Sequence, residues 1–120
     1  MSIKYNVGEI GNRPWGTWHC IAVGDKYIVK IITVKPYASL SLQLHKMRSD
    51  HWVVVSGAPR ITVGDSVSDF HCGESVDIPV DTRHRLENLT DAPVVVLEVQ
   101  MGDVLDETDI VRLSDIYNRQ

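Results

Sequence analysis

The sequence predicts an all-β domain, a sandwich or barrel of short strands, and two observations support this prediction. Short runs rich in Val, Ile, Thr, Tyr and Trp recur along the chain, and most have the length of one strand: TWHCIAV, KYIVKIITVK, HWVVVSG, PRITVG and VVVLEVQ. Turn sequences separate several of these runs: GDK at 24–26, GAP at 57–59 and VGDS at 63–66. Many short strands with frequent turns are typical of this fold class.

The organisation of the chain is that of one domain. Its 120 residues are enough for one hydrophobic core and too few for a second independent one. The sequence contains no repeat of fixed period, no low-complexity segment and no linker. We therefore expect a single domain over residues 1–120.

The C-terminal segment ETDIVRLSDIYNR departs from the strand pattern. Ile110, Leu113, Ile116 and Tyr117 recur at helical spacing, and Thr108 is available as an N-cap. This segment predicts a short C-terminal helix that docks on the β-domain.

Charge and hydropathy exclude some classes of partner. The chain has 12 Lys+Arg against 16 Asp+Glu, a formal net charge of -4, and no basic stripe, so we expect no nucleic-acid partner. The N-terminus lacks the apolar region of a signal peptide, and no apolar run approaches the roughly 20 residues that cross a bilayer. We expect a cytoplasmic protein that does not bind membranes.

The most informative segment is SLQLHKMRSDHW at 41–52, which predicts one half of a metal site. Gln43 and His45 are two residues apart, so in a strand both side chains point to the same face. Asp50 follows after four residues, and Gly57 follows in the next turn. A strand pair joined in this way can direct an amide oxygen, an imidazole and a carboxylate into one cavity.

His84 predicts the other half, because it follows a turn that contains Pro79 and opens a strand. Two imidazoles, a carboxylate and an amide oxygen form a mixed nitrogen and oxygen ligand set for a divalent ion. We expect zinc first, although the residue types alone do not choose among zinc, manganese, iron, cobalt and nickel.

These two segments resemble the paired motifs of cupins, with Gly73, Pro79, His84 and Asn88 at the spacing of the second motif. More narrowly, residues 13–119 resemble the cupin domain of type II phosphomannose isomerases, which usually follows a mannose-1-phosphate guanylyltransferase domain. The segments that carry this resemblance are RPWG, ITVKP, LSLQ, HWVVVSG, HRLEN, EVQ and DIVR. It implies a double-stranded β-helix, or jelly-roll barrel, and a homodimer that pairs through its sheets.

The sequence departs from that family at several positions. Asp50 stands where the family typically has Glu, and Met47 replaces a common His. Tyr37 and Asp81 stand where turns usually carry Gly, and Tyr37 predicts that its turn has changed. Ile31 stands where a basic residue is frequent, which could weaken the binding of a sugar phosphate.

The resemblance implies a metal-dependent isomerase that interconverts mannose 6-phosphate and fructose 6-phosphate. The metal would polarise the sugar carbonyl while a base moves a proton between two carbons. Lys30, His51 and Glu87 are the candidate bases.

Three arginines are candidates for contact with the sugar phosphate, because guanidinium groups match phosphate oxygens. Arg48 and Arg83 are the candidates for substrate binding, and Arg85 joins Lys30 and Glu87 as a candidate catalytic residue. Regular strand alternation points Arg85 away from His84, so a bulge or twist is needed for both to face the cavity.

Two other functions stay open. One is a non-catalytic, metal-binding cupin that binds a sugar or sugar nucleotide, or that regulates a partner enzyme. The other is a metal-dependent dioxygenase, which the ligand set permits but the flanking segments do not favour.

Overall fold

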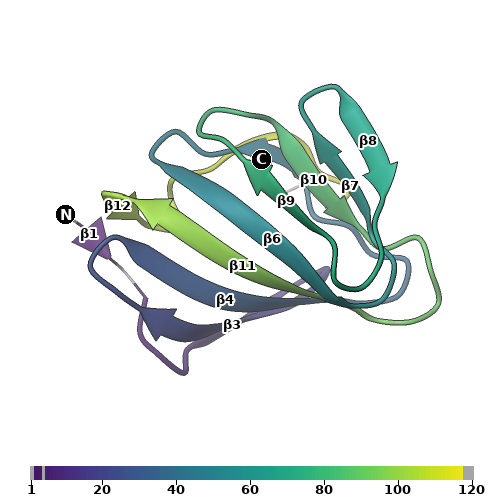
Figure 1. Cartoon of the computed structure of the whole chain (residues 1–120), viewed down its shortest axis with the longest axis horizontal. Coiled ribbons are helices and arrows are strands. Elements are labelled where there is room, and N and C mark those ends of the chain that lie inside the picture. Colours follow the sequence, from purple (N-terminus) through teal and green to yellow (C-terminus); the bar gives the residue numbers. More distant parts are fainter. Residues whose placement is uncertain (1, 4, 118–120) are drawn as a thin grey trace.

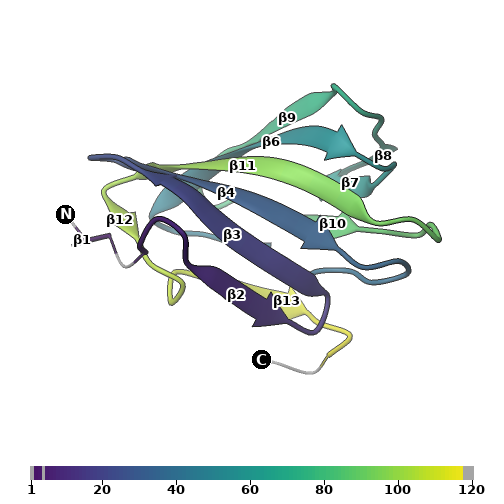
Figure 2. The same ribbon diagram turned by 90° about the horizontal axis from the view of Figure 1, so that it is seen from below.

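The computed structural model describes residues 2–3 and 5–117 and arranges them as two sheets that face each other (Figure 1, Figure 2). The described residues contain no helix, and hence none that is long and apolar enough to cross a membrane. The prediction of an all-β fold is confirmed.

The larger sheet has six antiparallel strands in the order β2-β3-β4-β11-β6-β9. Its strands are β2 (Ile10–Arg13), β3 (Gly16–Val23), β4 (Tyr27–Val34), β6 (Arg48–Ser56), β9 (Ser75–Ile78) and β11 (Val94–Gly102). The predicted turn at 24–26 joins β3 to β4.

The smaller sheet has five antiparallel strands in the order β13-β5-β10-β7-β8. Its strands are β5 (Leu42–Leu44), β7 (Arg60–Val63), β8 (Ser66–Asp69), β10 (His84–Glu87) and β13 (Val111–Ser114). A parallel pair, β1 (Ser2–Ile3) and β12 (Val104–Leu105), lies outside both sheets. The predicted turns near 57–59 and 63–66 join β6 to β7 and β7 to β8.

The hydrophobic core fills one end of the space between the sheets. In the larger sheet, Val96 of β11 lies opposite Ile32 of β4 on one side and Val54 of β6 on the other. All three side chains are buried, because alternate residues of each strand face the interior. The core continues with Val34, Ile61, Leu86 and Val94.

Farther along the same strands, the interior side chains become polar. Glu98 of β11 lies opposite Lys30 of β4 and Trp52 of β6, and Gln100 lies opposite Asp50. All five side chains are buried. Buried polar groups need partners, so the fold concentrates polar chemistry at this end of the interior.

The predicted C-terminal helix is wrong for the described residues. The segment forms β13, in which Val111 pairs with Leu44 at the edge of β5. An edge strand offers unpaired backbone groups, and the β-branched residues Ile110 and Val111 favour a strand, so sheet pairing outweighs the helical spacing. Residues 118 and 119 of the predicted helix lie outside the described residues.

The predicted change of turn at Tyr37 is also wrong. Tyr37 has a φ of 57° and Asp81 a φ of 62°, the left-handed region that favours glycine. The backbone amide of Tyr37 donates to the carbonyl of Thr90 at 3.1 Å, which holds the turn in this conformation. Each side chain is therefore accommodated at a conformational cost.

Tyr37→Gly is expected to raise the free energy of unfolding by about 1 kcal/mol, since it removes that cost. The tyrosine ring is 71% exposed, so little packing is lost. Urea denaturation measures the change. Tyr27→Gly is the matched control, because Tyr27 is also exposed but lies in β4, where glycine weakens the strand. A loss of stability in both variants would contradict the argument.

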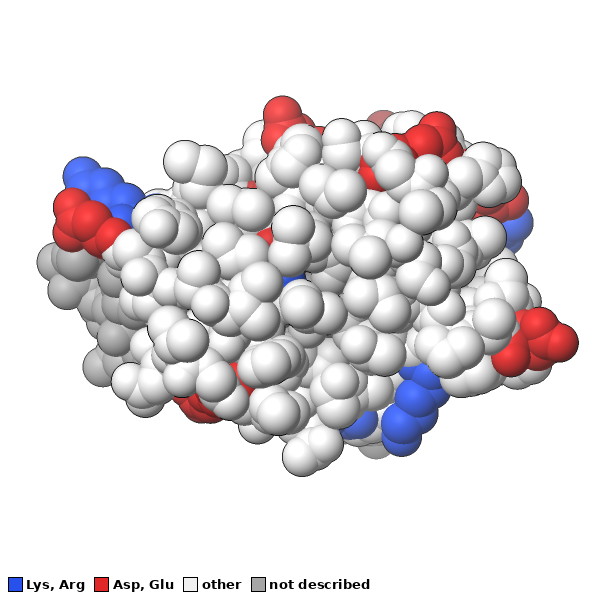
Figure 3. Space-filling model, turned by 60° about the horizontal axis from the view of Figure 1, so that its bottom comes forward, with Lys and Arg blue, Asp and Glu red and all other residues white. Residues whose placement is uncertain are grey.

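The outer side of the larger sheet is apolar over β3, β4, β11 and β6. Figure 3 shows this side, on which charged side chains gather at the margins. Met101 and Val55 are 57% and 51% exposed there. We call this surface the outer apolar face, and its members are Ile21, Tyr27, Val29, Ile31, Val53, Val55, Val95, Leu97, Val99 and Met101.

Candidate metal centre and its pocket

Three side chains that could bind a metal ion meet between the two sheets. Asp50 comes from β6, His84 from β10, and His45 directly follows β5. The Oδ2 atom of Asp50 lies 3.6 Å from Nε2 of His45 and 3.9 Å from Nε2 of His84. One ligand atom from each residue lies within 4.8 Å of the others, and all three residues are buried.

Both imidazole rings are oriented by backbone carbonyls. Nδ1 of His45 lies 2.6 Å from the carbonyl oxygen of Asp109, and Nδ1 of His84 lies 2.9 Å from that of Thr82. A carbonyl oxygen only accepts, so each Nδ1 carries the proton and each Nε2 keeps a lone pair, which in His45 accepts from Nη2 of Arg48. Such outer hydrogen bonds are typical of histidines that bind metals.

The two histidines are held neutral, which is the form that binds a metal. Burial, assisted by the positive charge of Arg48, lowers the pKa of His45 to about 3. Burial also lowers the pKa of His84.

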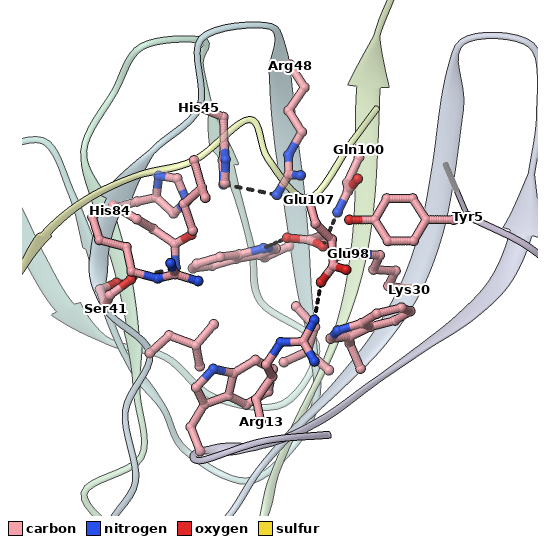
Figure 4. A pocket seen from close by; sticks show the side chains of 18 residues that line it. Tyr5, Arg13, Lys30, Ser41, His45, Arg48, His84, Glu98, Gln100 and Glu107 are labelled. Atoms are coloured by element: carbon pink, nitrogen blue, oxygen red, sulfur yellow. Dashed lines mark hydrogen bonds and ion pairs between the residues drawn. The ribbon is translucent and has the colours of Figure 1, made fainter. Parts of the chain in front are cut away.

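Arg48 lies against this group. Its Nε donates to Oδ1 of Asp50 at 3.0 Å, and its Nη2 lies 2.9 Å from Nε2 of His45 (Figure 4). Burial and the nearby Glu98 carboxylate raise the pKa of Asp50 to about 7, against the lowering effect of Arg48. A cation at this place therefore compensates a carboxylate that is costly to bury.

The residues present fit a divalent ion. His45, Asp50 and His84 offer two imidazole nitrogens and a carboxylate oxygen, a set that suits zinc and similar metals. Gln43 lies opposite His84 in the β5–β10 pair and is buried on the same face. Its Nε2 donates to the carbonyl of Ser41 at 3.4 Å, which leaves its amide oxygen as the candidate ligand.

A pocket adjoins the histidines and contains about 650 Å³ of empty space, counting the part that is open to solvent (Figure 4). Trp15, Trp18 and Trp52 contribute aromatic walls. The charged residues that line it are Arg13, Lys30, Arg48, Glu98, Glu107 and Arg112.

Glu98 is the buried anion of this pocket. Its Oε1 accepts from Nε1 of Trp52 at 3.0 Å, and its Oε2 accepts from Nε2 of Gln100 at 2.8 Å. Burial acts to raise its pKa, but Arg48, Lys30 and the two hydrogen bonds outweigh burial and lower the pKa to about 2. Glu98 is therefore ionised.

Lys30 is the buried cation opposite Glu98. Burial lowers its pKa to about 8, against the raising effect of Glu98. Its Nζ lies 3.6 Å from the ring centroid of Tyr5 and 4.2 Å from that of Trp18. These aromatic faces stabilise the charged form of Lys30 and so act against the effect of burial on its pKa.

Comparison with known proteins identifies the family. A family model described as mannose-6-phosphate isomerase C-terminal matches residues 4–115. The chain belongs to this family. XanB, the xanthan biosynthesis protein of Xanthomonas campestris pv. campestris (strain B100), is 48% identical over 107 residues, which cover 89% of this chain and 23% of XanB. The mannose-1-phosphate guanylyltransferase of Escherichia coli (strain K12) is 44% identical over 107 residues, which cover 89% of this chain and 22% of that protein.

The chain thus spans less than a quarter of the length of these relatives. Solved structures agree on the fold. Oxalate decarboxylase from Lactobacillus farciminis superposes with a TM-score of 0.74 at 20% identity, over 88% of this chain and 33% of that chain. CapF from Staphylococcus aureus superposes with a TM-score of 0.70 at 24% identity, over 88% of this chain and 34% of the CapF chain. The mannose-6-phosphate isomerase C-terminal domain is therefore an all-β cupin here, as the sequence predicts.

The structure brings the predicted metal ligands together. His45, Asp50 and His84 form the buried group, with Gln43 on the same face. The one-methylene difference between Asp and the Glu typical of the family does not keep Asp50 out of this group.

Two further predicted residues, Lys30 and Arg48, line the pocket. His51, the alternative base, lies on the outer side of β6, where its Nδ1 is 2.5 Å from Oδ1 of Asp77. Of the candidate bases, Lys30 is the one that the pocket contains.

Arg83, Arg85 and Glu87 do not line the pocket. In β10, exposure alternates regularly from His84 onward, so Arg85 and Glu87 face away from His84 and pair with each other at 2.7 Å. The bulge that would turn Arg85 inward is absent from the described pairings of β10. Arg83 is exposed and pairs with Asp65.

Arg13, Glu98, Gln100 and Arg112 are among the polar residues of the pocket that sequence reasoning missed. Glu98 and Gln100 interrupt the apolar strand VVVLEVQ at alternate positions, which is a usable signal for an inward-facing polar pair. Arg13 and Arg112 belong to the family-like segments RPWG and DIVR. Residue spacing alone assigns them no role.

Proposed function

We propose that this domain is a metal-dependent isomerase that interconverts mannose 6-phosphate and fructose 6-phosphate. The observation that carries the proposal is the buried group of His45, Asp50 and His84 beside a pocket rich in cations. Membership of the mannose-6-phosphate isomerase C-terminal family supports the choice of substrate.

We propose zinc as the ion, held by His45, Asp50, His84 and the amide oxygen of Gln43. When bound, it would supply Lewis-acid polarisation of the sugar carbonyl. The hydrogen bonds from the histidine Nδ1 atoms to backbone carbonyls keep both rings in the binding orientation.

Lys30 is the base in this proposal. Isomerisation removes a proton from C2 of mannose 6-phosphate and delivers one to C1, while the hydroxyl proton passes from O2 to O1. Lys30 lines the pocket, and its lowered pKa leaves part of the population neutral near pH 8. A neutral amine can accept the proton and, as an ammonium, return it.

Arg13 and Arg112 are the proposed phosphate-binding residues, in place of Arg83. Both line the pocket, whereas Arg83 pairs with Asp65 outside it. Their strands, β2 and β13, are edge strands of the two sheets. Guanidinium groups suit a phosphate dianion because they donate two hydrogen bonds in one plane.

The test of the function is the conversion of mannose 6-phosphate to fructose 6-phosphate, followed by proton NMR. Protein is loaded in turn with zinc, manganese, cobalt and nickel, and Asp50→Asn is assayed beside it. We expect turnover that needs both a metal and Asp50. Absence of turnover from protein that demonstrably contains the metal would overturn the proposal.

The pH dependence of kcat/KM tests the role of Lys30. Only the neutral amine accepts a proton, so kcat/KM is expected to rise as pH increases through about 8 and then to level off. Lys30→Arg, which keeps the charge opposite Glu98 but cannot become neutral, should lower kcat by roughly 100-fold or more. A rate that is independent of pH between 7 and 9 would contradict this role.

One observation favours a non-catalytic function instead. Arg48 contacts both His45 and Asp50, two of the candidate ligands. Its guanidinium group therefore supplies the hydrogen bonds and the positive charge that these two side chains would otherwise receive from a metal ion. A domain of this kind would bind a sugar or sugar nucleotide without converting it. Binding of mannose 6-phosphate without turnover, with every metal, would favour this alternative.

We further propose that the outer apolar face pairs with a second copy of the chain. Four strands at about 4.8 Å spacing and eight residues at about 3.3 Å cover about 500 Å² on each copy, or about 1,000 Å² in a symmetric pair, which reaches the lower bound for a biological interface. The face lacks Lys, Arg, Asp and Glu over its four central strands, so it selects an apolar partner such as itself.

The dimer is tested by sedimentation velocity over a range of concentrations. The wild type should sediment at twice the chain mass, and Leu97→Glu, at the centre of the face, should be monomeric. Leu89→Glu is the matched control, because Leu89 is exposed outside this face. A wild type that stays monomeric at millimolar concentration would overturn the pairing.

A further inference from the structure

Three buried polar side-chain atoms, which belong to residues that line the pocket, lack a protein partner. Nε1 of Trp18, Oγ of Ser41 and Oε1 of Gln100 are buried and have no hydrogen-bond partner among the described residues. All three residues line the pocket beside the candidate metal centre. Buried polar groups are nearly always paired in folded proteins, so three such atoms around one cavity need an explanation.

The orientation of Gln100 follows from its neighbour. The Nε2 of the Gln100 amide donates to Oε2 of Glu98 at 2.8 Å, so the NH₂ group faces Glu98. The amide oxygen therefore points away from Glu98. Gln100 is 1% exposed and lies opposite Asp50 across β11 and β6, next to the candidate metal centre.

Ser41 and Trp18 add complementary groups from other parts of the pocket. Ser41 is 1% exposed, and its hydroxyl can donate and accept. Trp18 in β3 packs against the ring of Tyr5, at 5.3 Å between centroids, and offers one N–H donor. Figure 4 shows Ser41 on the side of His84 and Gln100 on the side of Glu98.

We infer that Trp18, Ser41 and Gln100 recognise hydroxyl groups of a sugar and so determine the specificity of the pocket. The three atoms are neutral and combine a donor, an acceptor and a hydroxyl that is both. This combination matches a polyol, whereas a phosphate needs cations and an apolar ligand would leave all three unpaired. The inference rests on the proposed function in taking a hexose phosphate as the ligand.

Ser41→Ala is the decisive variant, because it removes an atom with no described partner and little else. Calorimetric titration of the zinc-loaded chain with mannose 6-phosphate is expected to show about tenfold weaker binding. The melting temperature should be unchanged or higher, and the zinc content unchanged. Ser68→Ala, an exposed serine of β8, is the matched control and should change none of these quantities.

Monodeoxy analogues of mannose 6-phosphate sharpen the test. If Ser41 recognises one hydroxyl, the analogue that lacks this hydroxyl should bind the wild type and Ser41→Ala equally. Trp18→Phe, which removes the N–H and keeps an aromatic ring, should behave in the same way toward a different analogue.

The outcomes separate this inference from the proposed function. Unchanged affinity in both variants, or a loss of melting temperature without a loss of affinity, would overturn the inference while isomerase activity stands. Weaker binding of mannose 6-phosphate by the two variants, combined with a wild type that binds this sugar but does not convert it, would support the inference and overturn the isomerase. A wild type that does not bind mannose 6-phosphate would overturn both.

Discussion

Asp50→Asn is expected to lower the affinity of the domain for zinc by roughly 100-fold or more and to abolish isomerase activity. Asp50 contributes the carboxylate of the buried group and lies 3.6 Å and 3.9 Å from the two imidazole nitrogens. Asparagine keeps the size of the side chain but removes its charge, and the loss of a ligand exceeds the 10–100-fold cost known for residues that merely orient ligands.

Competition with a chromophoric chelator measures that affinity. Asp77→Asn is the matched control, since Asp77 is an exposed carboxylate on the neighbouring strand β9. The melting temperature of each variant must be recorded, because Arg48 loses its carboxylate partner in Asp50→Asn. Equal zinc affinity in the wild type and in folded Asp50→Asn would show that Asp50 is not a zinc ligand.

Glu98→Leu is expected to lower the free energy of unfolding by about 3–5 kcal/mol, the cost of breaking a buried ion pair by removing one partner. Glu98 is buried between the cations Lys30 and Arg48 and accepts hydrogen bonds from Trp52 and Gln100. Leucine would leave both cations without this anion and both donors without an acceptor.

Urea denaturation of Glu98→Leu and Glu87→Leu tests this directly. Glu87 forms an ion pair with Arg85 on the outer side of β10, where the Arg85 and Glu87 side chains remain 30% and 16% exposed and Glu87 faces a single cation, so its loss should cost less than the loss of Glu98. Equal losses in the two variants would contradict the argument.

Glu98 also makes the stability of the fold depend on pH. The folded-state pKa of Glu98 is about 2, below its ordinary value of 4.5. Its contribution to stability is therefore complete above pH 4.5 and is lost as pH falls from 4.5 toward 2. The difference in stability between the wild type and Glu98→Gln should narrow over this window, and a constant difference would show that the charge of Glu98 does not contribute.

Local spacing in the sequence was sufficient for the all-β fold class and for the two halves of the candidate metal site. Alternation along short strands indicated the sheets, and the two-residue separation of Gln43 and His45 put them on one face. Asp50 and His84 lie on different sheets, and the resemblance to the cupin motifs supplied the link between them.

The rest of the site depends on pairings that spacing does not reveal. Glu98 meets Lys30 and Trp52 through the register of three strands, and β13 brings Arg112 beside Gln43 by pairing with β5. The same pairing replaced the predicted helix by a strand. Arg85 belongs to a family-like segment, but regular alternation in β10 turns it outward.

The most direct test of the account is a titration of metal-free protein with zinc in the presence of mannose 6-phosphate, with the formation of fructose 6-phosphate and the bound zinc measured in the same samples. We expect activity to rise in proportion to bound zinc and to reach its maximum at one ion per chain. Activity that persists in metal-free protein, or one bound zinc per chain without any fructose 6-phosphate, would contradict it.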